Sequence, residues 1–275
     1  MRLLAIDIDG TLLDQQFQIT AHNLAALQRT HQAGIQVVLV TGRRHTFALP
    51  VAEALGFEVA LISSNGAITR SSSGELFHRD LMPARTTRRL IAEMRDFRRA
   101  AVITFDIRGR GELVLEDPAA FVGNIGRWID KNAEYIEQVV PIEDSLVRDP
   151  VQAMFCGPVA EMKRAQQALG ASSVISEVTV LRTQYDWRDL CIVDVLNRGC
   201  SKGHALERWA QSRGIGREQV MAIGDNYNDV EMLEWSGIPV VMGNASDELK
   251  QNGWHETRPN TESGVAAAIE ELIGI

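Results

Sequence analysis

Short apolar runs alternate with amphipathic stretches near the start of the chain. The apolar runs cover 3–6, 35–40 and 59–62, and helical spacing of apolar residues marks the segments 20–34 and 51–56 between them. Runs of this length that are apolar throughout are typical of strands buried on both faces. The order of strand and helix therefore predicts a parallel sheet with helices packed against it.

The same alternation returns near the C-terminus. A helix is predicted over 203–213, a strand over 220–223, a helix over 230–235, a strand over 238–242 and a last helix over 263–273. The two ends of the chain are thus expected to contribute to one α/β domain.

Between these ends the pattern changes to shorter strands with alternating polar and apolar residues. The predicted middle elements are strands at 112–115, 174–181 and 190–195, and amphipathic helices at about 84–97, 117–131 and 158–169. This texture indicates an inserted α+β domain.

Charge and hydrophobicity exclude several classes of protein. The chain has 275 residues, 45% of them hydrophobic, and a net charge of −8 from 28 basic and 36 acidic residues. This charge opposes nonspecific binding to nucleic acid or anionic membranes, and an anionic substrate would need local compensation such as a metal. Because no apolar run approaches a membrane span and an apolar strand follows Met1 and Arg2 directly, a cytoplasmic location is expected.

The three cysteines indicate neither a disulfide framework nor a zinc site. Cys156, Cys191 and Cys200 form no CxxC pair and are odd in number. They are expected to be buried or idle thiols.

The first acidic group follows the first predicted strand, as Asp7-Ile8-Asp9-Gly10-Thr11. In open α/β sheets ligands bind beyond the carboxyl ends of the strands, and alternation places Asp7 and Asp9 on the same side. Two close carboxylates can divide nucleophilic and acid/base work or hold one hard cation. An isolated motif of this kind is equally consistent with acids that cap a turn.

A second acidic group, Gly224 to Asp229, follows another apolar strand and opens a helix. Acids in this position often only cap a helix and complement its dipole. A calcium EF-hand loop fits poorly, because Tyr227 stands where an oxygen ligand belongs. Two acidic groups at two strand ends suggest a shared magnesium site.

Two further features, taken alone, are weak evidence for a functional site. Thr41-Gly42-Arg43 ends the 35–40 strand and is expected to enter a helix whose free N–H groups can receive a phosphate oxygen. Lys202 follows Ser201, a predicted helix N-cap, and so lies in a first turn where a cation opposes the helix dipole. A strand-end Thr-Gly is usually a turn, and such a lysine is usually solvated.

Together these residues resemble the haloacid dehalogenase-like hydrolase superfamily. Its four motifs match Asp7 to Thr11, Thr41, Lys202 and Gly224 to Asp229, in order. A long insertion between the second and third motifs, with Asn65-Gly66-Ala67, looks like the Cof-type subfamily.

The resemblance implies a Rossmann-like parallel-sheet core over 1–82 and 190–275. It also implies an inserted α+β cap domain over 83–189 that sets substrate specificity. The match to the family rests on the core motifs, whereas for the cap it rests on size and element pattern alone.

The same resemblance implies roles for the motif residues. Asp7 attacks phosphorus to form an aspartyl-phosphate, and Asp9 protonates the leaving alcohol and then activates water. Mg²⁺ is held by the Asp7 side chain, the Asp9 carbonyl and Asp225, with Asp229 holding these from outside the ligand sphere. The implied phosphate-binding groups are Ile8, Thr41, Gly42, Lys202 and Asn228.

The expected substrate is a small phosphorylated metabolite, such as a sugar phosphate or phosphorylated cofactor. A phosphomutase that returns the phosphoryl group to a sugar stays open as an alternative, as does a non-catalytic sensor of phosphorylated metabolites. No nucleic-acid or membrane partner is expected, and the sequence does not indicate an oligomeric state.

Overall fold

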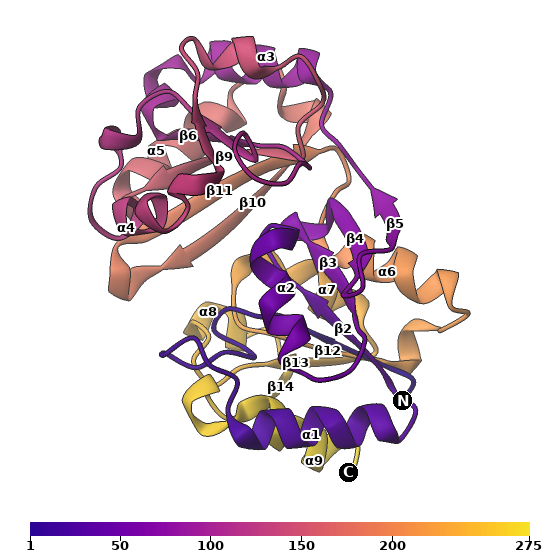
Figure 1. Cartoon of the computed structure of the whole chain (residues 1–275). Helices are drawn as coiled ribbons and strands as arrows, with labels where there is room; N and C mark the ends of the chain where they lie inside the picture. Colours follow the sequence, from indigo (N-terminus) through magenta and orange to yellow (C-terminus); the bar gives the residue numbers. More distant parts are fainter. The chain divides into compact units, whose positions relative to one another are not determined.

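The chain divides into two units in the computed structural model, which describes residues 1–275 apart from the side chain of Trp187. Unit 1 comprises Met1–Arg79 and Ser201–Ile275, and unit 2 comprises Asp80–Cys200 (Figure 1). Each unit has its own sheet and its own apolar clusters, as expected of a folding domain.

Unit 1 contains an eight-stranded sheet. Its spatial order is β14 (His255–Glu256), β13 (Ile238–Val241), β12 (Val220–Gly224), β1 (Leu3–Ile6), β2 (Gln36–Val40), β3 (Ala60–Ser63), β4 (Ile68–Ser71) and β5 (Leu76–Arg79). The strands from β14 to β3 run parallel, and β4 and β5 add antiparallel pairs at one edge. The carboxyl ends of β12, β1 and β2 therefore lie next to one another.

Helices cover both faces of this sheet, which explains why β1 is apolar throughout. Leu4 and Ile6 pack into a cluster with α1, α2 and α9, whereas Leu3 and Ala5 pack into one with α6 and α7. The helix bounds are α1 Ala21–Gln32, α2 His45–Glu53, α6 Lys202–Ser212, α7 Val230–Trp235, α8 Asp247–Lys250 and α9 Gly264–Leu272. Helices α1 and α9 lie side by side (Figure 1).

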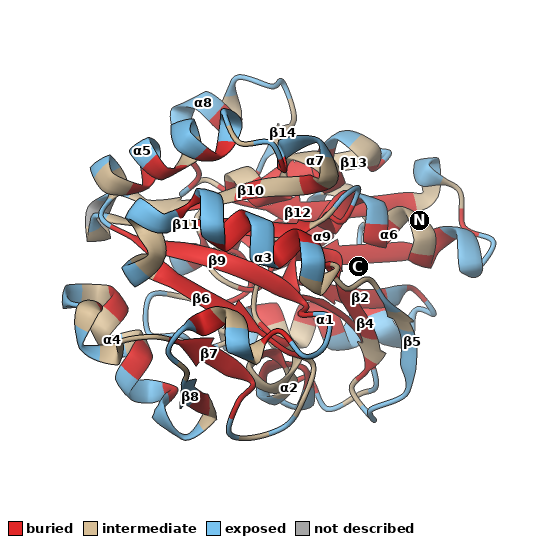
Figure 2. Cartoon of the chain, turned by 90° about the horizontal axis from the view of Figure 1, so that it is seen from above, coloured by how far each residue is buried: buried red, intermediate tan, exposed pale blue. Residues whose placement is uncertain are grey.

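Unit 2 contains a six-stranded sheet. Its spatial order is β10 (Val178–Tyr185), β11 (Leu190–Asn197), β9 (Gln152–Gly157), β6 (Ala101–Thr104), β7 (Leu113–Leu115) and β8 (Ile136–Gln138). All pairs are antiparallel except β7 with β8. The central β9 is buried along its whole length and appears red in Figure 2.

The helices of unit 2 are divided between the faces of its sheet. Helices α3 (Ala84–Glu93) and α5 (Val159–Gly170) pack on the face that includes Phe155, and α4 (Gly123–Lys131) packs on the face that includes Met154. This arrangement of helices on an antiparallel sheet is an α+β architecture.

The division between the units differs from the predicted boundaries. The family resemblance placed residues 190–200 in the core, although the pattern grouped the strand at 190–195 with the inserted domain; β11 pairs with β9 and β10 and so belongs to unit 2. Residues 80–82 also belong to unit 2, where Met82 is buried in an apolar cluster. Packing of Met82 decides the first boundary and long-range strand pairing decides the second, and local pattern encodes neither.

Some elements of unit 2 are also displaced from their predicted positions. The helix predicted over 117–131 begins only at Gly123, because Asp117 caps a separate 3-10 turn at Pro118–Ala120. The strand predicted over 174–181 runs instead over 178–185, after another 3-10 turn.

The predicted α/β class, with a parallel-sheet core, is confirmed. The three cysteines are buried and free, as expected. Among the described residues, no helix combines the length and apolar character of a membrane span.

Candidate active site

The predicted site residues of unit 1 gather at one edge of its sheet. Asp7 follows β1, Thr41 follows β2, Asp225 follows β12, and Lys202 begins α6. Because β12, β1 and β2 are adjacent and parallel, their carboxyl ends meet there. This is where open α/β sheets bind ligands.

Lys202 lies between two carboxylates in the interior of unit 1. Its Nζ donates to Oδ1 of Asp7 and to Oδ1 of Asp229, each over 2.6 Å. The lysine side chain is only 1% exposed. Lysines in the first turn of a helix are usually solvated, but Lys202 is buried and paired with two carboxylates.

Three aspartates form a buried acidic cluster around this lysine. Carboxylate oxygens of Asp7, Asp225 and Asp229 all lie within 4.8 Å of one another. Burial, and then the charge of Asp229, raises the pKa of Asp7 to about 7, although Lys202 opposes the shift. Burial and the charges of Asp7 and Asp229 likewise raise the pKa of Asp225 well above its usual range.

The surroundings favour the charged form of Lys202, whereas they disfavour the charged forms of Asp7 and Asp225. Burial opposes its charge, but Asp229 and Asp7 outweigh burial and raise the pKa of Lys202 above its usual range. Lys202 therefore stays an ammonium ion. When all three carboxylates are ionised, the single ammonium leaves net negative charge in the cluster, which favours binding of a cation.

The donor set of the acidic cluster fits a hard divalent cation. Carboxylate oxygens are the protein ligands that Mg²⁺ and Ca²⁺ prefer. In Asp229, Oδ2 accepts from the N–H groups of Asp225 and Asn226, and Oδ1 accepts from Lys202. Asp229 is thus engaged in holding its neighbours, so Asp7 and Asp225 are the better candidates for direct ligands.

The capping interpretation of the second acidic group also holds. Asn226 and Asp229 form a capping box at the 3-10 turn Tyr227–Asp229, which leads into α7. Asp229 therefore serves a local helix start and the buried ion pair with Lys202 at once.

The loop after β1 is built to pass close to Asp225. Gly10 has φ +85°, and a Cβ there would lie 2.3 Å from Oδ2 of Asp225, so only glycine fits. The hydroxyl of the buried Thr11 donates to Oδ1 of Asp225 over 3.0 Å. The two acidic groups of the sequence are thus joined directly.

Asp9 lies apart from the acidic cluster and pairs with Arg43. The Nε of Arg43 donates to Oδ2 of Asp9 over 2.7 Å, and a terminal guanidinium nitrogen donates to Oδ1 over 2.6 Å. Such a two-point pair fixes the plane of the carboxylate. The sequence suggested only that Arg43 lies close to the site.

The Thr41–Arg43 segment does not begin a helix, contrary to the expectation. Helix α2 starts at His45 after Arg44 in an extended conformation. Thr41 and Gly42 instead lie in a loop, where the Thr41 hydroxyl accepts from the Arg43 N–H over 3.0 Å. Ile8, whose N–H is another predicted phosphate donor, lies in the loop after β1 with its side chain fully buried.

Three asparagines complete the edge of the sheet. Asn65 accepts from Nδ2 of Asn228 over 2.9 Å. Asn244, after β13, donates to the Gly10 carbonyl over 2.8 Å and lies 3.5 Å from Oδ2 of Asp225. Asn244 was missed in the sequence, although a polar residue in the loop after a parallel strand is a usable signal.

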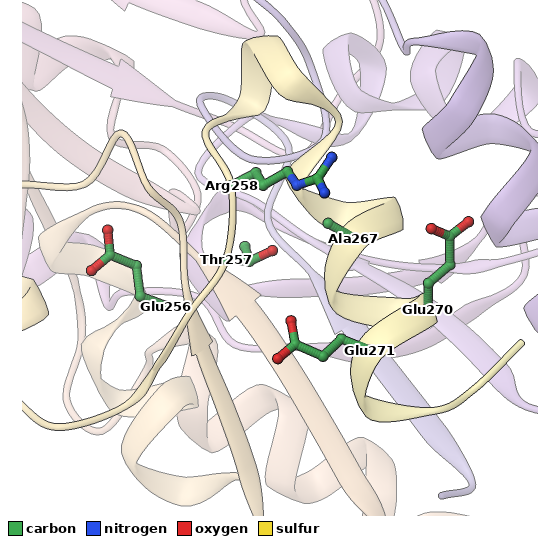
Figure 3. Close-up of a pocket in the computed structure, with 6 residues that line it drawn as sticks. All are labelled: Glu256, Thr257, Arg258, Ala267, Glu270 and Glu271. Atoms are coloured by element: carbon green, nitrogen blue, oxygen red, sulfur yellow. The ribbon is translucent and has the colours of Figure 1, made fainter.

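A separate cavity of about 730 Å³ lies elsewhere in unit 1 (Figure 3). It is lined by Glu256, Thr257, Arg258, Ala267, Glu270 and Glu271. It shares no residue with the acidic cluster, and Glu270 is already paired with His22 and Arg29. The predicted catalytic residues therefore lie outside this cavity.

A Rossmann-like sheet with buried aspartates and a lysine at its carboxyl edge is the arrangement that the four sequence motifs predict. The family model described as haloacid dehalogenase-like hydrolase matches residues 4–269. The chain therefore belongs to the haloacid dehalogenase-like hydrolase family, as its motifs indicated.

The relatives agree with this family. Phosphatase YwpJ of Bacillus subtilis is 29% identical over 99% of this chain and 100% of its own length. Pyridoxal phosphate phosphatase YbhA of Escherichia coli is 29% identical over 98% of this chain and 97% of its own length. A crystal structure of a haloacid dehalogenase-like hydrolase from Bacteroides thetaiotaomicron, 25% identical, matches with a TM-score of 0.80 over 98% and 99% of the two chains. The predicted enzyme class, a hydrolase of phosphate monoesters, is confirmed at the level of this family.

Proposed function

We propose that this enzyme is a magnesium-dependent phosphatase that hydrolyses a small phosphorylated metabolite through an aspartyl-phosphate on Asp7. The observation that carries the proposal is the buried pair of Asp7 and Lys202 inside the acidic cluster. The pyridoxal phosphate named for one relative makes a phosphorylated cofactor or a sugar phosphate the proposed substrate class.

Asp7 is the proposed nucleophile because its carboxylate is held in place by Lys202 at a strand end. One oxygen of Asp7 forms a bond to phosphorus while the bond from phosphorus to the leaving oxygen breaks. Lys202 carries positive charge next to the reacting group and offsets the negative charge of the phosphoryl oxygens.

Asp9 is the proposed proton carrier. It donates a proton to the leaving oxygen, and it later takes one from the water that attacks the phosphorus of the aspartyl-phosphate. The bond from phosphorus to Asp7 then breaks, which restores the free carboxylate. The pair with Arg43 sets the orientation of Asp9, and release of one of those hydrogen bonds frees an oxygen for proton transfer.

Asp7, the Asp9 carbonyl and Asp225 are the proposed ligands of Mg²⁺, with Asp229 holding them in place. When bound, the ion neutralises charge on the phosphoryl oxygens. The proposed donors to those oxygens are the Ile8 and Gly42 N–H groups and the side chains of Thr41, Lys202 and Asn228. We also propose that unit 2 helps to select the substrate. The proposed location of the protein is the cytoplasm.

Phosphate release from a panel of sugar phosphates, nucleotides, flavin mononucleotide and pyridoxal phosphate tests the proposal. Wild-type protein with Mg²⁺ is expected to release phosphate from at least one member, and EDTA is expected to abolish the release. No release from any member, or equal release by the Asp7→Asn variant, would show that the proposal is wrong.

A further inference from the structure

Asn65 is a fully buried polar residue directly beyond β3, at the same edge of the sheet as the acidic cluster. Its backbone is left-handed, with φ 52° and ψ 30°, and Ser64 before it has φ 49°. Non-glycine residues seldom adopt this conformation, and asparagine tolerates it best. Strained backbone of this kind gathers at functional sites, where the surrounding structure maintains it.

The contacts of Asn65 join the loops after β2 and β12. Its main-chain N–H donates to the Thr41 carbonyl over 3.0 Å, and its Oδ1 accepts from Nδ2 of Asn228 over 2.9 Å. A Cβ added at Gly42 would lie 3.2 Å from Oδ1 of Asn65, so the amide packs against the Gly42 backbone. Three of the proposed phosphate-binding residues thus contact Asn65, Thr41 through the main chain of Asn65 and Gly42 and Asn228 through its side chain.

The same turn also approaches the start of α6. Gly66 has φ +107°, and a Cβ there would lie 2.2 Å from the carbonyl oxygen of Ser201. Ser201 immediately precedes Lys202, so the turn that presents Asn65 is packed against the segment that presents the lysine. A relaxed turn would disturb both sides of the site.

We propose that Asn65 is a positioning residue that orients the Asn228 amide and the Gly42 main chain toward the phosphoryl oxygens. The inference rests on the proposed phosphatase function, because it takes a phosphate group as the ligand. An amide has two N–H donors, and donation of one to Asn65 fixes the direction of the other. Donors held in place before the substrate arrives need no rearrangement during the reaction.

A substitution with glycine isolates the side chain of Asn65. Asn65→Gly keeps the left-handed backbone accessible and keeps the N–H that bonds to Thr41, but removes the acceptor for Asn228. Ser64→Gly is the matched control, because glycine also accepts the left-handed backbone of Ser64, so the turn is kept and the amide of Asn65 stays in place. Asn228→Ala and the double variant Asn65→Gly/Asn228→Ala complete a cycle.

The experiment measures kcat and KM for p-nitrophenyl phosphate, the Kd of inorganic phosphate in the presence of Mg²⁺, and the Tm of each variant. Asn65→Gly is expected to lower kcat/KM by about tenfold or more and to weaken phosphate binding by a similar factor. Ser64→Gly is expected to leave both values unchanged. In the Asn228→Ala background, Asn65→Gly is expected to change kcat/KM and the phosphate Kd by less than about twofold.

Two results would overturn the inference. One is unchanged kcat/KM and phosphate Kd in Asn65→Gly, even with a lower Tm, since the residue would then serve the fold alone. The other is the same loss from Asn65→Gly with and without Asn228, which would exclude action through that amide. If wild type binds phosphate but releases none from any substrate, the phosphatase proposal fails while the binding comparison still decides the role of Asn65.

Discussion

Each unit contains an ionic cluster, which is buried in unit 1 and partly buried in unit 2. The pKa values of the carboxyl groups shift in opposite directions in the two clusters. In unit 2, Arg98 donates to Glu116 and to Glu143 over 2.7 Å each. These hydrogen bonds lower the pKa of both glutamates. In unit 1, burial and mutual repulsion raise the pKa values of Asp7 and Asp225.

The difference follows from how many donors each cluster supplies. The guanidinium of Arg98 offers several N–H donors to two carboxylates, and its side chain keeps 24% exposure. Lys202 is buried and donates to only two of three closely spaced carboxylates. Contacts that lower the pKa of a carboxyl group stabilise the folded protein at neutral pH. A buried cluster that raises carboxyl pKa values is typical of binding and catalytic sites.

The largest expected effect comes from Asp7→Asn. The amide keeps the shape of the side chain but cannot attack phosphorus, so kcat for p-nitrophenyl phosphate is expected to fall by about 10⁴-fold or more. The free energy of unfolding is expected to stay equal or to rise, because a carboxylate repelled by its neighbours is removed. A large loss of stability on urea unfolding would contradict this view of the acidic cluster.

Lys202→Met is expected to damage both activity and folding. The substitution leaves Asp7 and Asp229 buried without their cation, and breaking a buried pair costs about 3–5 kcal/mol. Lys250→Met is the control, because Lys250 pairs with the half-exposed Glu256 and is expected to contribute less than about 1 kcal/mol. Urea unfolding followed by circular dichroism distinguishes the two, and equal costs would contradict the account.

Magnesium is expected to stabilise unit 1. A cation that binds the folded acidic cluster at 100 times its Kd adds about 2.7 kcal/mol to the free energy of unfolding. Calorimetry of EDTA-treated protein, with and without added Mg²⁺, measures the shift. The Asp225→Asn variant is expected to lose most of it, whereas Arg98→Met, which alters unit 2 only, is expected to keep it.

The smallest expected effect is the pH dependence that arises from unit 2. The folded pKa values of Glu116 and Glu143 lie below the ordinary 4.5, so their contribution is present above that pH and is lost as pH falls through the lowered values. Arg98→Met is expected to lower the free energy of unfolding by about 1–2 kcal/mol at neutral pH and to flatten its fall in acid. An unchanged acid slope would show that the Arg98 hydrogen bonds contribute little.

Local pattern in the sequence was sufficient for β1, β2, β3, β12 and β13 and for the acidic groups, but it did not predict β4, β5 or β14. The predicted strands are short apolar runs, and Asp7, Thr41 and Asp225 follow the ends of three of them. Parallel topology alone then brings these positions to one edge of the sheet. The N-cap Ser201, predicted from residue type, accepts the backbone N–H group of His204.

Contacts between side chains of distant segments could not be predicted in this way. The pair of Asp9 with Arg43 and the pair of Asn65 with Asn228 depend on loop conformations, including a left-handed turn that no residue pattern specifies. The predicted core boundary at residue 190 was wrong for the same reason, since the alternation of β11 marks a strand but not its partners. These contacts decide how the site is held, even though the motif residues decide what it contains.

Trapping of a phosphorylated Asp7 tests the central claim most directly. The Asp9→Asn variant, mixed with Mg²⁺ and p-nitrophenyl phosphate, lacks the group that activates water, while this substrate releases its leaving group without protonation. After an acid quench, mass spectrometry is expected to find a phosphoryl group on the peptide that contains Asp7, and none in Asp7→Asn/Asp9→Asn. Hydrolysis by wild type with no adduct on that peptide, together with full turnover by Asp7→Asn, would contradict the account.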